Sequence, residues 1–332
     1  PTLPRLAAVL ALALPLLLAG PTSADEDAAA ARDVRLLASY ALTPDGQTLV
    51  LAWRGDLWRV PTAGGAAQRL TWHPASDRQP EISDDGRRIA FVSDRAGSAQ
   101  VFVMPLTGGR PKQVTVHTEG FRLYDWFPGG KALLVRARLD HAFRDGGRLF
   151  RRALDPEAPL ELLFDAAGGS ATVSPDGTRI AFVREGVGWA RKGYQGSQAG
   201  QVWVHDLETG TFTKVTRGDH GERSPLWSAD GRHLYVASQE SGTFNLWRVD
   251  PTSGERTQLT DFEDDGVLFP AISADGRTIV FRRLFDLYRF DPTTGGEPQR
   301  IEIEDVGDPT VDPVLHRTLR SASAVAFTDD AR

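Results

Sequence analysis

Short runs of alternating hydrophobic and polar residues recur along the chain, with tight-turn signals between them. In residues 172–183, the sequence Ser174-Pro175-Asp176-Gly177 separates two such runs. Proline presets φ in a turn, and Asp-Gly supplies the left-handed backbone that closes a hairpin. After the turn, Ile180 and Phe182 alternate on one face, as a half-buried strand requires. The segment therefore predicts a strand, a turn and a second strand.

This pattern of strand, turn and strand occurs six times and dominates the sequence. The turn glycines stand at positions 46, 86, 130, 177, 231 and 276, with gaps of 40, 44, 47, 54 and 45 residues. A period of this length, with roughly four short strands in each repeat, is typical of propeller blades. We therefore predict an all-β fold in which residues 39–305 form a six-bladed β-propeller of four-stranded blades.

The last part of the chain predicts the start of a further repeat. Residues 323–330 resemble an opening strand, and Asp330 follows Asp275 by 55 residues, where the next turn aspartate would fall. We interpret residues 306–332 as a linker and the first strand of a truncated second propeller. The chain is then expected to be cut as that repeat begins.

The N-terminal residues have the pattern of a secretory signal peptide. Arg5 precedes an apolar run, residues 6–19, which is too short for a membrane span, and small residues suit cleavage after Ala24. We predict a signal peptide over 1–24 and a polar spacer over 25–38. The alternative for the apolar run is a buried helix. The prediction is an exported, periplasmic protein with no membrane association after cleavage, or a cytoplasmic one if the segment is not a functional signal.

The amino-acid composition argues against several classes of function. The chain has 332 residues, a net charge of −6 and no Cys. The acidic balance argues against nucleic-acid binding, which needs a clustered basic surface. The lack of Cys excludes disulfides, thiolate metal sites and a Cys nucleophile. The seven His are scattered without ligand spacing, and the Asp-Gly turns lack the aspartate ladder of a calcium loop, so we expect no metal and no cofactor.

The repeats resemble the WD40-like repeats of the TolB and tricorn propellers. The shared pattern is Ser/Thr-x-Asp-Gly-x-x-Ile/Leu-x-Phe, then x-Leu/Val-Trp/Phe, then x-x-Leu/Val-Thr, and it covers residues 40–301. Two further stretches, residues 121–138 and 184–197, look like the N-terminal six-bladed propeller of tricorn-type serine peptidases. In that family a seven-bladed propeller, a PDZ domain and the catalytic regions follow. The resemblance therefore implies a serine peptidase as the full-length parent.

No catalytic residue is predicted within this chain. The sequence contains no Gly-x-Ser-x-Gly nucleophile elbow, no His-Glu-x-x-His and no P-loop. Residues 196–200, Gly-Ser-Gln-Ala-Gly, lack the frame that a nucleophile elbow needs.

Two inserts carry the candidate ligand-binding residues, because binding residues concentrate in loops on a rigid scaffold. The first insert is basic within an acidic protein, and the second combines cations with aromatic rings. The candidates are Arg136, Arg138, His141 and Arg144 in the first insert and Trp189, Arg191, Lys192 and Tyr194 in the second. Such loops could hold a peptide's carboxylate or acidic side chains through charge-assisted hydrogen bonds. The alternatives are a solvated loop or a loop that docks a neighbouring domain.

Three functions remain open from the sequence. The first is the non-catalytic propeller portion of an exported tricorn-like serine peptidase, which binds or gates peptides and scaffolds the assembly. The second is a stand-alone TolB-like periplasmic protein-binding propeller. The third is the propeller of a prolyl-oligopeptidase-like enzyme. The expected partners are peptides or a protein partner and the downstream catalytic domains of the parent chain, with a homo-oligomer left open.

Overall fold

The computed structural model describes residues 32–139, 146–184, 186, 188, 191–217 and 219–305. All regular secondary structure in these residues is β-strand, and they belong to one compact unit, residues 31–307. The predicted signal peptide and the predicted truncated repeat lie outside the described residues.

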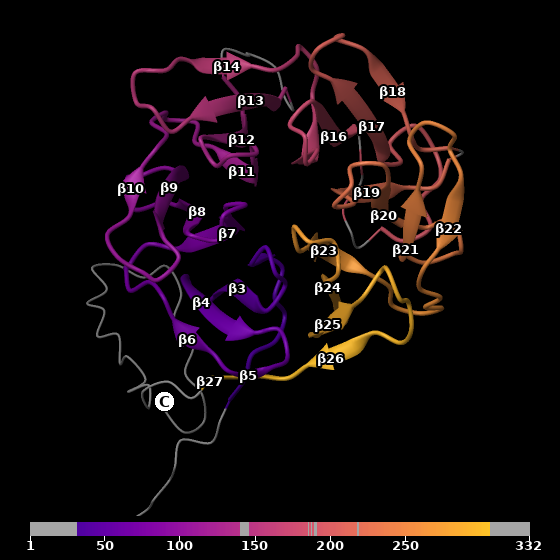
Figure 1. The fold of residues 1–332 in the computed structure, drawn as a ribbon, viewed down its shortest axis with the longest axis horizontal. Helices are drawn as coiled ribbons and strands as arrows, with labels where there is room; N and C mark the ends of the chain where they lie inside the picture. Colours follow the sequence, from indigo (N-terminus) through magenta and orange to yellow (C-terminus); the bar gives the residue numbers. More distant parts are fainter. Residues whose placement is uncertain are drawn as a thin grey trace, which may run out of the picture. The chain divides into compact units, whose positions relative to one another are not determined.

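Six four-stranded antiparallel sheets form blades around a ring (Figure 1). The blades of the first half are β2 (Tyr40–Leu42), β3 (Thr48–Trp53), β4 (Asp56–Pro61) and β6 (Gln68–Arg69); β7 (Asp77–Ile82), β8 (Arg88–Ser93), β9 (Gln100–Pro105) and β10 (Lys112–Gln113); and β11 (Arg122–Trp126), β12 (Ala132–Ala137), β13 (Arg148–Ala153) and β14 (Leu160–Leu162). Those of the second half are β15 (Gly169–Val173), β16 (Arg179–Arg184), β17 (Gln201–Asp206) and β18 (Phe212–Lys214); β19 (Glu222–Trp227), β20 (Leu234–Ser238), β21 (Asn245–Val249) and β22 (Arg256–Gln258); and β23 (Leu268–Ile272), β24 (Ile279–Arg283), β25 (Asp286–Phe290) and β26 (Gln299–Ile301).

The first strand of each blade lies nearest the axis. These inner strands contact one another in the order β2, β7, β11, β15, β19 and β23, and β23 returns to β2. The ring is therefore closed, and the prediction of a six-bladed all-β propeller is confirmed.

A small additional sheet joins the two ends of the ring. β27 (Ile303–Asp305), just after the sixth blade, pairs antiparallel with β1 (Arg32–Asp33) and parallel with β5 (Gly65–Ala66) of the first blade's outer loop. β1 falls within the segment that the sequence suggested as a spacer. Hydrogen bonds between residues more than 200 positions apart thus reinforce the contact between the first and last blades.

The Asp-Gly turns have the geometry that their residues dictate. In the fourth blade, the Ser174 hydroxyl donates to the Asp176 carboxylate over 2.5 Å, and Gly177 has φ +76°. Four other turns make the same contact, with Thr43–Asp45, Ser83–Asp85, Ser228–Asp230 and Ser273–Asp275. The third blade has Phe-Pro-Gly-Gly instead, and its Gly129 N–H donates to Asp84 of the neighbouring blade.

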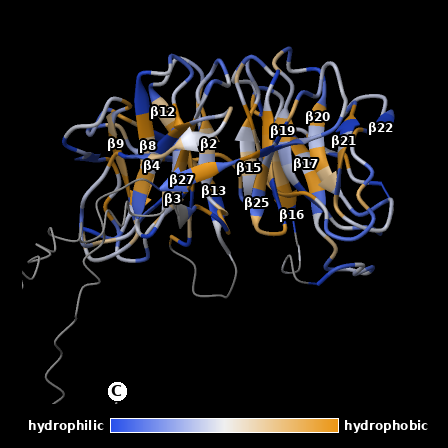
Figure 2. Cartoon of the chain, turned by 90° about the horizontal axis from the view of Figure 1, so that it is seen from below, coloured by the Kyte–Doolittle hydropathy of each residue, from blue (hydrophilic) through white to orange (hydrophobic). Residues whose placement is uncertain are grey.

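The hydrophobic core lies between adjacent blades. Leu134 and Leu149 of the third blade pack with Ile180 and Phe182 of the fourth, and all four are fully buried. Hydropathy alternates accordingly, with hydrophobic strands and mostly hydrophilic connecting loops (Figure 2). Because each sheet is buried on both faces only when a neighbour covers it, stacking the blades around an axis stabilises every one of them.

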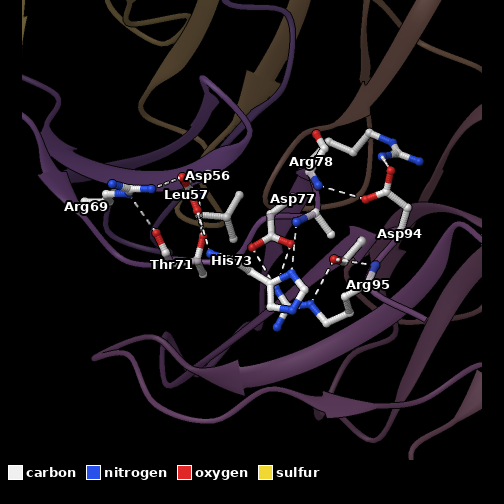
Figure 3. A network of polar contacts seen from close by, with 12 residues as sticks. Asp56, Leu57, Arg69, Thr71, His73, Asp77, Arg78, Asp94 and Arg95 are labelled. Atoms are coloured by element: carbon white, nitrogen blue, oxygen red, sulfur yellow. Dashed lines mark hydrogen bonds and ion pairs between the residues drawn. The ribbon is translucent and has the colours of Figure 1, made fainter. Parts of the chain in front are cut away.

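A threonine after the outer strand fastens that strand to the third strand in several blades. In the first blade, Thr71 Oγ1 accepts from the Leu57 N–H over 2.9 Å and contacts the Asp56 carboxylate at 3.2 Å (Figure 3). Equivalent bonds join Thr115 to the Val101 N–H, Thr216 to the Val202 N–H and Thr260 to the Leu246 N–H. This explains why the repeat pattern ends in threonine, since its hydroxyl satisfies a buried backbone donor.

Candidate functional site

A cavity of ≈ 440 Å³ lies at the centre of the ring. All six inner strands line it, together with turn residues such as Pro44 and Pro175. Its size is within the range of small-molecule and cofactor sites, which run from roughly 300 to 1,000 Å³. Every blade therefore contributes residues to this cavity.

β-Bulges shape the wall of this cavity. Five inner strands shift register against their neighbours, and in four of them a non-glycine residue has positive φ. These residues are Gln79 (φ 51°), Ser170 (φ 44°), Ser224 (φ 47°) and Phe269 (φ 52°), and all four line the cavity. Left-handed backbone at non-glycine residues costs roughly 1–3 kcal/mol each and clusters at functional sites. Four of the seven described non-glycine residues with positive φ therefore lie on the cavity wall, and the other three are Leu36, Arg54 and Leu284.

One position on each inner strand forms a ring around the cavity. It is the fifth residue before each turn glycine, and we call this set the central ring: Ala41, Glu81, Asp125, Thr172, Leu226 and Ala271. Blades two to four contribute the two acids and the threonine, whereas the other three blades contribute apolar residues. The central ring is thus polar on one side and apolar on the other.

Asp125 joins the third blade to the fourth. One carboxylate oxygen accepts from the Thr172 hydroxyl and the Val173 N–H, both at 2.8 Å, and the other accepts from the Trp126 N–H at 2.8 Å. Burial raises the pKa of Asp125 to about 6, although these hydrogen bonds act in the opposite direction. The hydrogen bonds hold the carboxylate in place while burial disfavours its charge.

Glu81 stands at the same position in the second blade. Burial and the nearby Asp125 carboxylate raise the pKa of Glu81 well above its usual value. Its backbone carbonyl accepts from the Trp126 indole at 2.9 Å, which ties the second blade to the third. Within the described residues its carboxylate has neither a hydrogen bond nor an ion pair, and the residue is half-buried on the cavity wall.

Neither acid is among the site residues predicted from the sequence. The signal that reveals them is the repeat alignment, because carboxylates replace alanine, threonine or leucine at one register position in adjacent blades.

The first predicted insert begins at the end of β12 farthest from the Phe-Pro-Gly-Gly turn. Arg136 is half-buried, and its guanidinium contacts the Gly147 carbonyl at 3.4 Å. Arg138 is exposed directly after the strand. His141 and Arg144 lie outside the described residues.

The second predicted insert begins at the corresponding end of β16 and extends to later blades. Lys192 pairs with Asp265 at 2.5 Å, and the Gly193 N–H donates to the Gln239 side chain at 2.5 Å. The Arg191 guanidinium lies 4.2 Å from the centre of the Tyr194 ring. Trp189 lies outside the described residues. These contacts connect the insert to blades five and six.

None of the five described candidates lines the central cavity. Arg136 lies near the end of β12, and the other four follow the second strands of the third and fourth blades, at the strand ends opposite the turns. These are Arg138, Arg191, Lys192 and Tyr194. Their role in ligand binding stays a prediction, separate from the cavity.

The described residues contain no group of three His, Cys, Asp or Glu side chains that could hold a metal ion. Nor do they include a helix that is long and apolar enough to cross a membrane.

Comparison with known proteins is consistent with this geometry. Residues 36–296 match the family described as the tricorn protease N-terminal beta propeller domain. Tricorn protease homolog 1 of Streptomyces coelicolor is 28% identical over 250 residues, which cover 72% of this chain and 22% of that protein. The crystal structure of the tricorn protease superposes with a TM-score of 0.69 at 21% identity, over 83% of this chain and 27% of that one.

The crystal structure of TolB from Acinetobacter baumannii matches with a TM-score of 0.59 and 18% identity, covering 81% of this chain and 66% of that chain. At this identity the likeness concerns the fold alone. The chain spans about a fifth of tricorn protease homolog 1 and about a quarter of the solved tricorn protease.

Proposed function

Because the chain belongs to the tricorn protease N-terminal β-propeller family, we propose that it is the non-catalytic propeller portion of an exported tricorn-like serine peptidase. In this role it binds or gates peptides and scaffolds the assembly. The observation that carries the proposal is the cavity at the centre of the closed ring, to which every blade contributes. A peptide bound in such a cavity would be surrounded by the inner strands of all six blades.

The two inserts supply a second element of the proposal. Their cations and aromatic rings suit the carboxylate of a peptide or its acidic side chains. The stacking of Arg191 on Tyr194 orients one such cation, and the pair of Lys192 with Asp265 anchors the loop that carries it. We propose that these loops contact peptide acids at the face opposite the Asp-Gly turns.

Calorimetric titration of the full 332-residue chain with the N-acetylated peptide Ala-Ala-Asp-Ala-Ala tests this binding. We expect the double variant Arg191→Ala/Lys192→Ala to bind at least several-fold more weakly while unfolding at nearly the same temperature. The matched control is Arg59→Ala/Lys214→Ala, which removes two exposed charges from β4 and β18, strands that carry no residue of the second insert. Equal affinity in the two double variants would exclude the second insert as a ligand site.

Sequencing the gene beyond the Arg332 codon tests the assembly role. A second propeller, a PDZ domain and a serine peptidase region would support the proposal. A stop codon there would favour a TolB-like protein-binding propeller, and a downstream Gly-x-Ser-x-Gly elbow would favour a prolyl-oligopeptidase-like enzyme.

Export is tested by fusing residues 1–38 to alkaline phosphatase, which becomes active only in an oxidising compartment. Phosphatase activity in intact bacteria is expected, and a fusion that stays inactive would overturn the periplasmic location.

A further inference from the structure

The wall of the central cavity carries acidic side chains and no basic ones among the described residues. Its lining includes three carboxylates, those of Glu81, Asp84 and Asp125, and among the described residues no Arg, Lys or His lines it. Asp84 lies at the turn end and accepts from the Gly129 N–H at 2.7 Å. Glu81 and Asp125 lie deeper, in the central ring. The cavity is therefore acidic although basic side chains are common elsewhere on the propeller.

The two acids of the central ring differ in how they are satisfied. Asp125 accepts three hydrogen bonds from Trp126, Thr172 and Val173. The Glu81 carboxylate has no such partner within the described part of the chain, and it lies on the cavity wall close enough to Asp125 to feel its charge. Neighbouring buried carboxylates repel each other unless a proton or a cation lies between them. An entering cation would find one acceptor preoriented by the fold and a second acceptor free to bind it.

The opposite side of the central ring suits the rest of a cationic side chain. Ala41, Leu226 and Ala271 present only aliphatic groups to the cavity. Lysine and arginine side chains consist of an aliphatic stem and a cationic head. They favour sites that have acidic groups on one side and apolar groups on the other. A free metal ion would not use the apolar side, and a cavity of ≈ 440 Å³ exceeds what it needs.

We propose that the central cavity binds the cationic group of a peptide, with Glu81 and Asp125 as its acceptors and the apolar side of the central ring against its aliphatic stem. This inference rests on the proposed peptide-binding function and specifies the ligand chemistry at the cavity. The inserts and the cavity would then bind different parts of a peptide, since the inserts suit acidic groups and the cavity suits basic ones.

Binding of a cation should depend on pH in a defined direction. A cation beside Glu81 and Asp125 favours their charged forms, so binding releases protons that the acids otherwise hold. The other titratable groups on the wall are Asp84, Tyr40 and Tyr124, and none of them is cationic. Since burial raises the pKa of Asp125 to about 6, the affinity for a permanently charged side chain should fall as the pH drops from 7.5 to 5.

Two peptides test the proposal on the full 332-residue chain by calorimetric titration. Both are Ala-Ala-X-Ala-Ala with acetylated N-termini and amidated C-termini, where X is lysine in one and the uncharged norleucine in the other. We expect the lysine peptide to bind about tenfold or more tightly, as a charge-assisted hydrogen bond to a half-buried carboxylate warrants. The Glu81→Gln variant should remove most of this preference, and the exposed control Glu255→Gln should retain it.

Each outcome decides a different part of the argument. Equal affinity for the two peptides in the unmodified chain would overturn the cationic site and leave peptide binding standing. If the chain bound neither the lysine peptide nor the norleucine peptide, and did not bind Ala-Ala-Asp-Ala-Ala, the proposed function itself would be overturned. A lysine preference that survives in Glu81→Gln and in Asp125→Asn would place the cation elsewhere and refute the assignment. The comparison of lysine with norleucine needs no variant, so it holds even if Glu81→Gln does not fold.

Discussion

The hydroxyl of Tyr40 donates to the backbone carbonyl of Phe269 over 2.6 Å, and this bond joins the first blade to the sixth. The two residues are 229 positions apart in sequence. Tyr40 is buried, and burial raises the pKa of its phenol far above the usual range, so the hydroxyl remains protonated and keeps donating at every physiological pH. The bond acts with the sheet of β1, β5 and β27 to close the ring.

Replacing Tyr40 with Phe should therefore destabilise the propeller by about 0.5–1.5 kcal/mol, the usual net worth of a hydrogen bond. Chemical unfolding followed by tryptophan fluorescence measures the change. The control is Tyr288→Phe, whose ring stacks on Phe281 within the sixth blade. Equal losses in the two variants would show that the Tyr40 hydroxyl contributes nothing to closure.

Gly177 tests the turn geometry. Its φ of +76° is strained for any side chain, and a Cβ there would meet only Pro128 at an ordinary 3.5 Å. The loss of stability on replacing Gly177 is therefore determined by backbone conformation and not by a steric clash. Gly177→Val should lower stability by roughly 1–3 kcal/mol, because a β-branched residue opposes positive φ. Gly177→Asn should cost clearly less, since asparagine tolerates this region. Equal thermal unfolding midpoints for valine and asparagine would contradict the account.

Two ion pairs in the second blade differ in both burial and distance (Figure 3). The Arg95 guanidinium donates to both oxygens of the Asp77 carboxylate, at 2.7 and 2.8 Å. The Asp77 side chain is fully buried. Arg78 reaches Asp94 at only 4.0 Å, with both side chains substantially exposed.

Arg95→Ala should cost about 3–5 kcal/mol because it leaves a buried carboxylate without its cation. Arg78→Ala should cost less than about 1 kcal/mol, as exposed pairs do. The free energies of unfolding of the two variants check the contrast. If Arg78→Ala proved as damaging as Arg95→Ala, the close and buried geometry of the Arg95–Asp77 pair would not determine the cost.

The repeat period predicted the fold because each blade must carry the same strands and turns. The alternation around Ile180 and Phe182 and the turn at Gly177 are local, so sequence alone reveals them. The small closing sheet is different, since β27 pairs with two segments that are distant in sequence and carry no strand pattern of their own. Nothing local distinguishes Arg32–Asp33 from a spacer.

The candidate site was harder to predict than the fold. Cations in long inserts attract notice, whereas Glu81 and Asp125 are single residues within ordinary strand patterns. Their importance follows from closure of the ring, which brings one register position of six blades to the same cavity. Likewise, the pair of Lys192 with Asp265 depends on the path of a loop across two blades.

The dependence of stability on pH follows from two opposed sets of carboxyl groups. Hydrogen bonds from Thr43 and Ser83 lower the pKa of Asp45 and Asp85, and in the fourth blade such bonds outweigh partial burial and lower the pKa of Asp176 to about 2. A lowered pKa stabilises the fold above the unfolded value, near 3.9, and this contribution is lost as the pH falls toward 2.

Glu81 and Asp125 act in the other direction. The pKa values of both carboxyls are raised in the folded state, so their contribution is fully present below the unfolded values. The contribution of Asp125 is lost as the pH rises through about 6, and that of Glu81 is lost as the pH rises well above its unfolded value. We therefore expect stability to peak near pH 4 to 5 and to decline on both sides. The double variant Glu81→Gln/Asp125→Asn should flatten the decline between pH 5 and 7 while the acid limb stays, and Glu255→Gln should change neither. Thermal unfolding midpoints measured from pH 2 to 8 test this expectation. If the midpoint of the double variant still declined between pH 5 and 7 as in the unmodified chain, other groups would be titrating in that range.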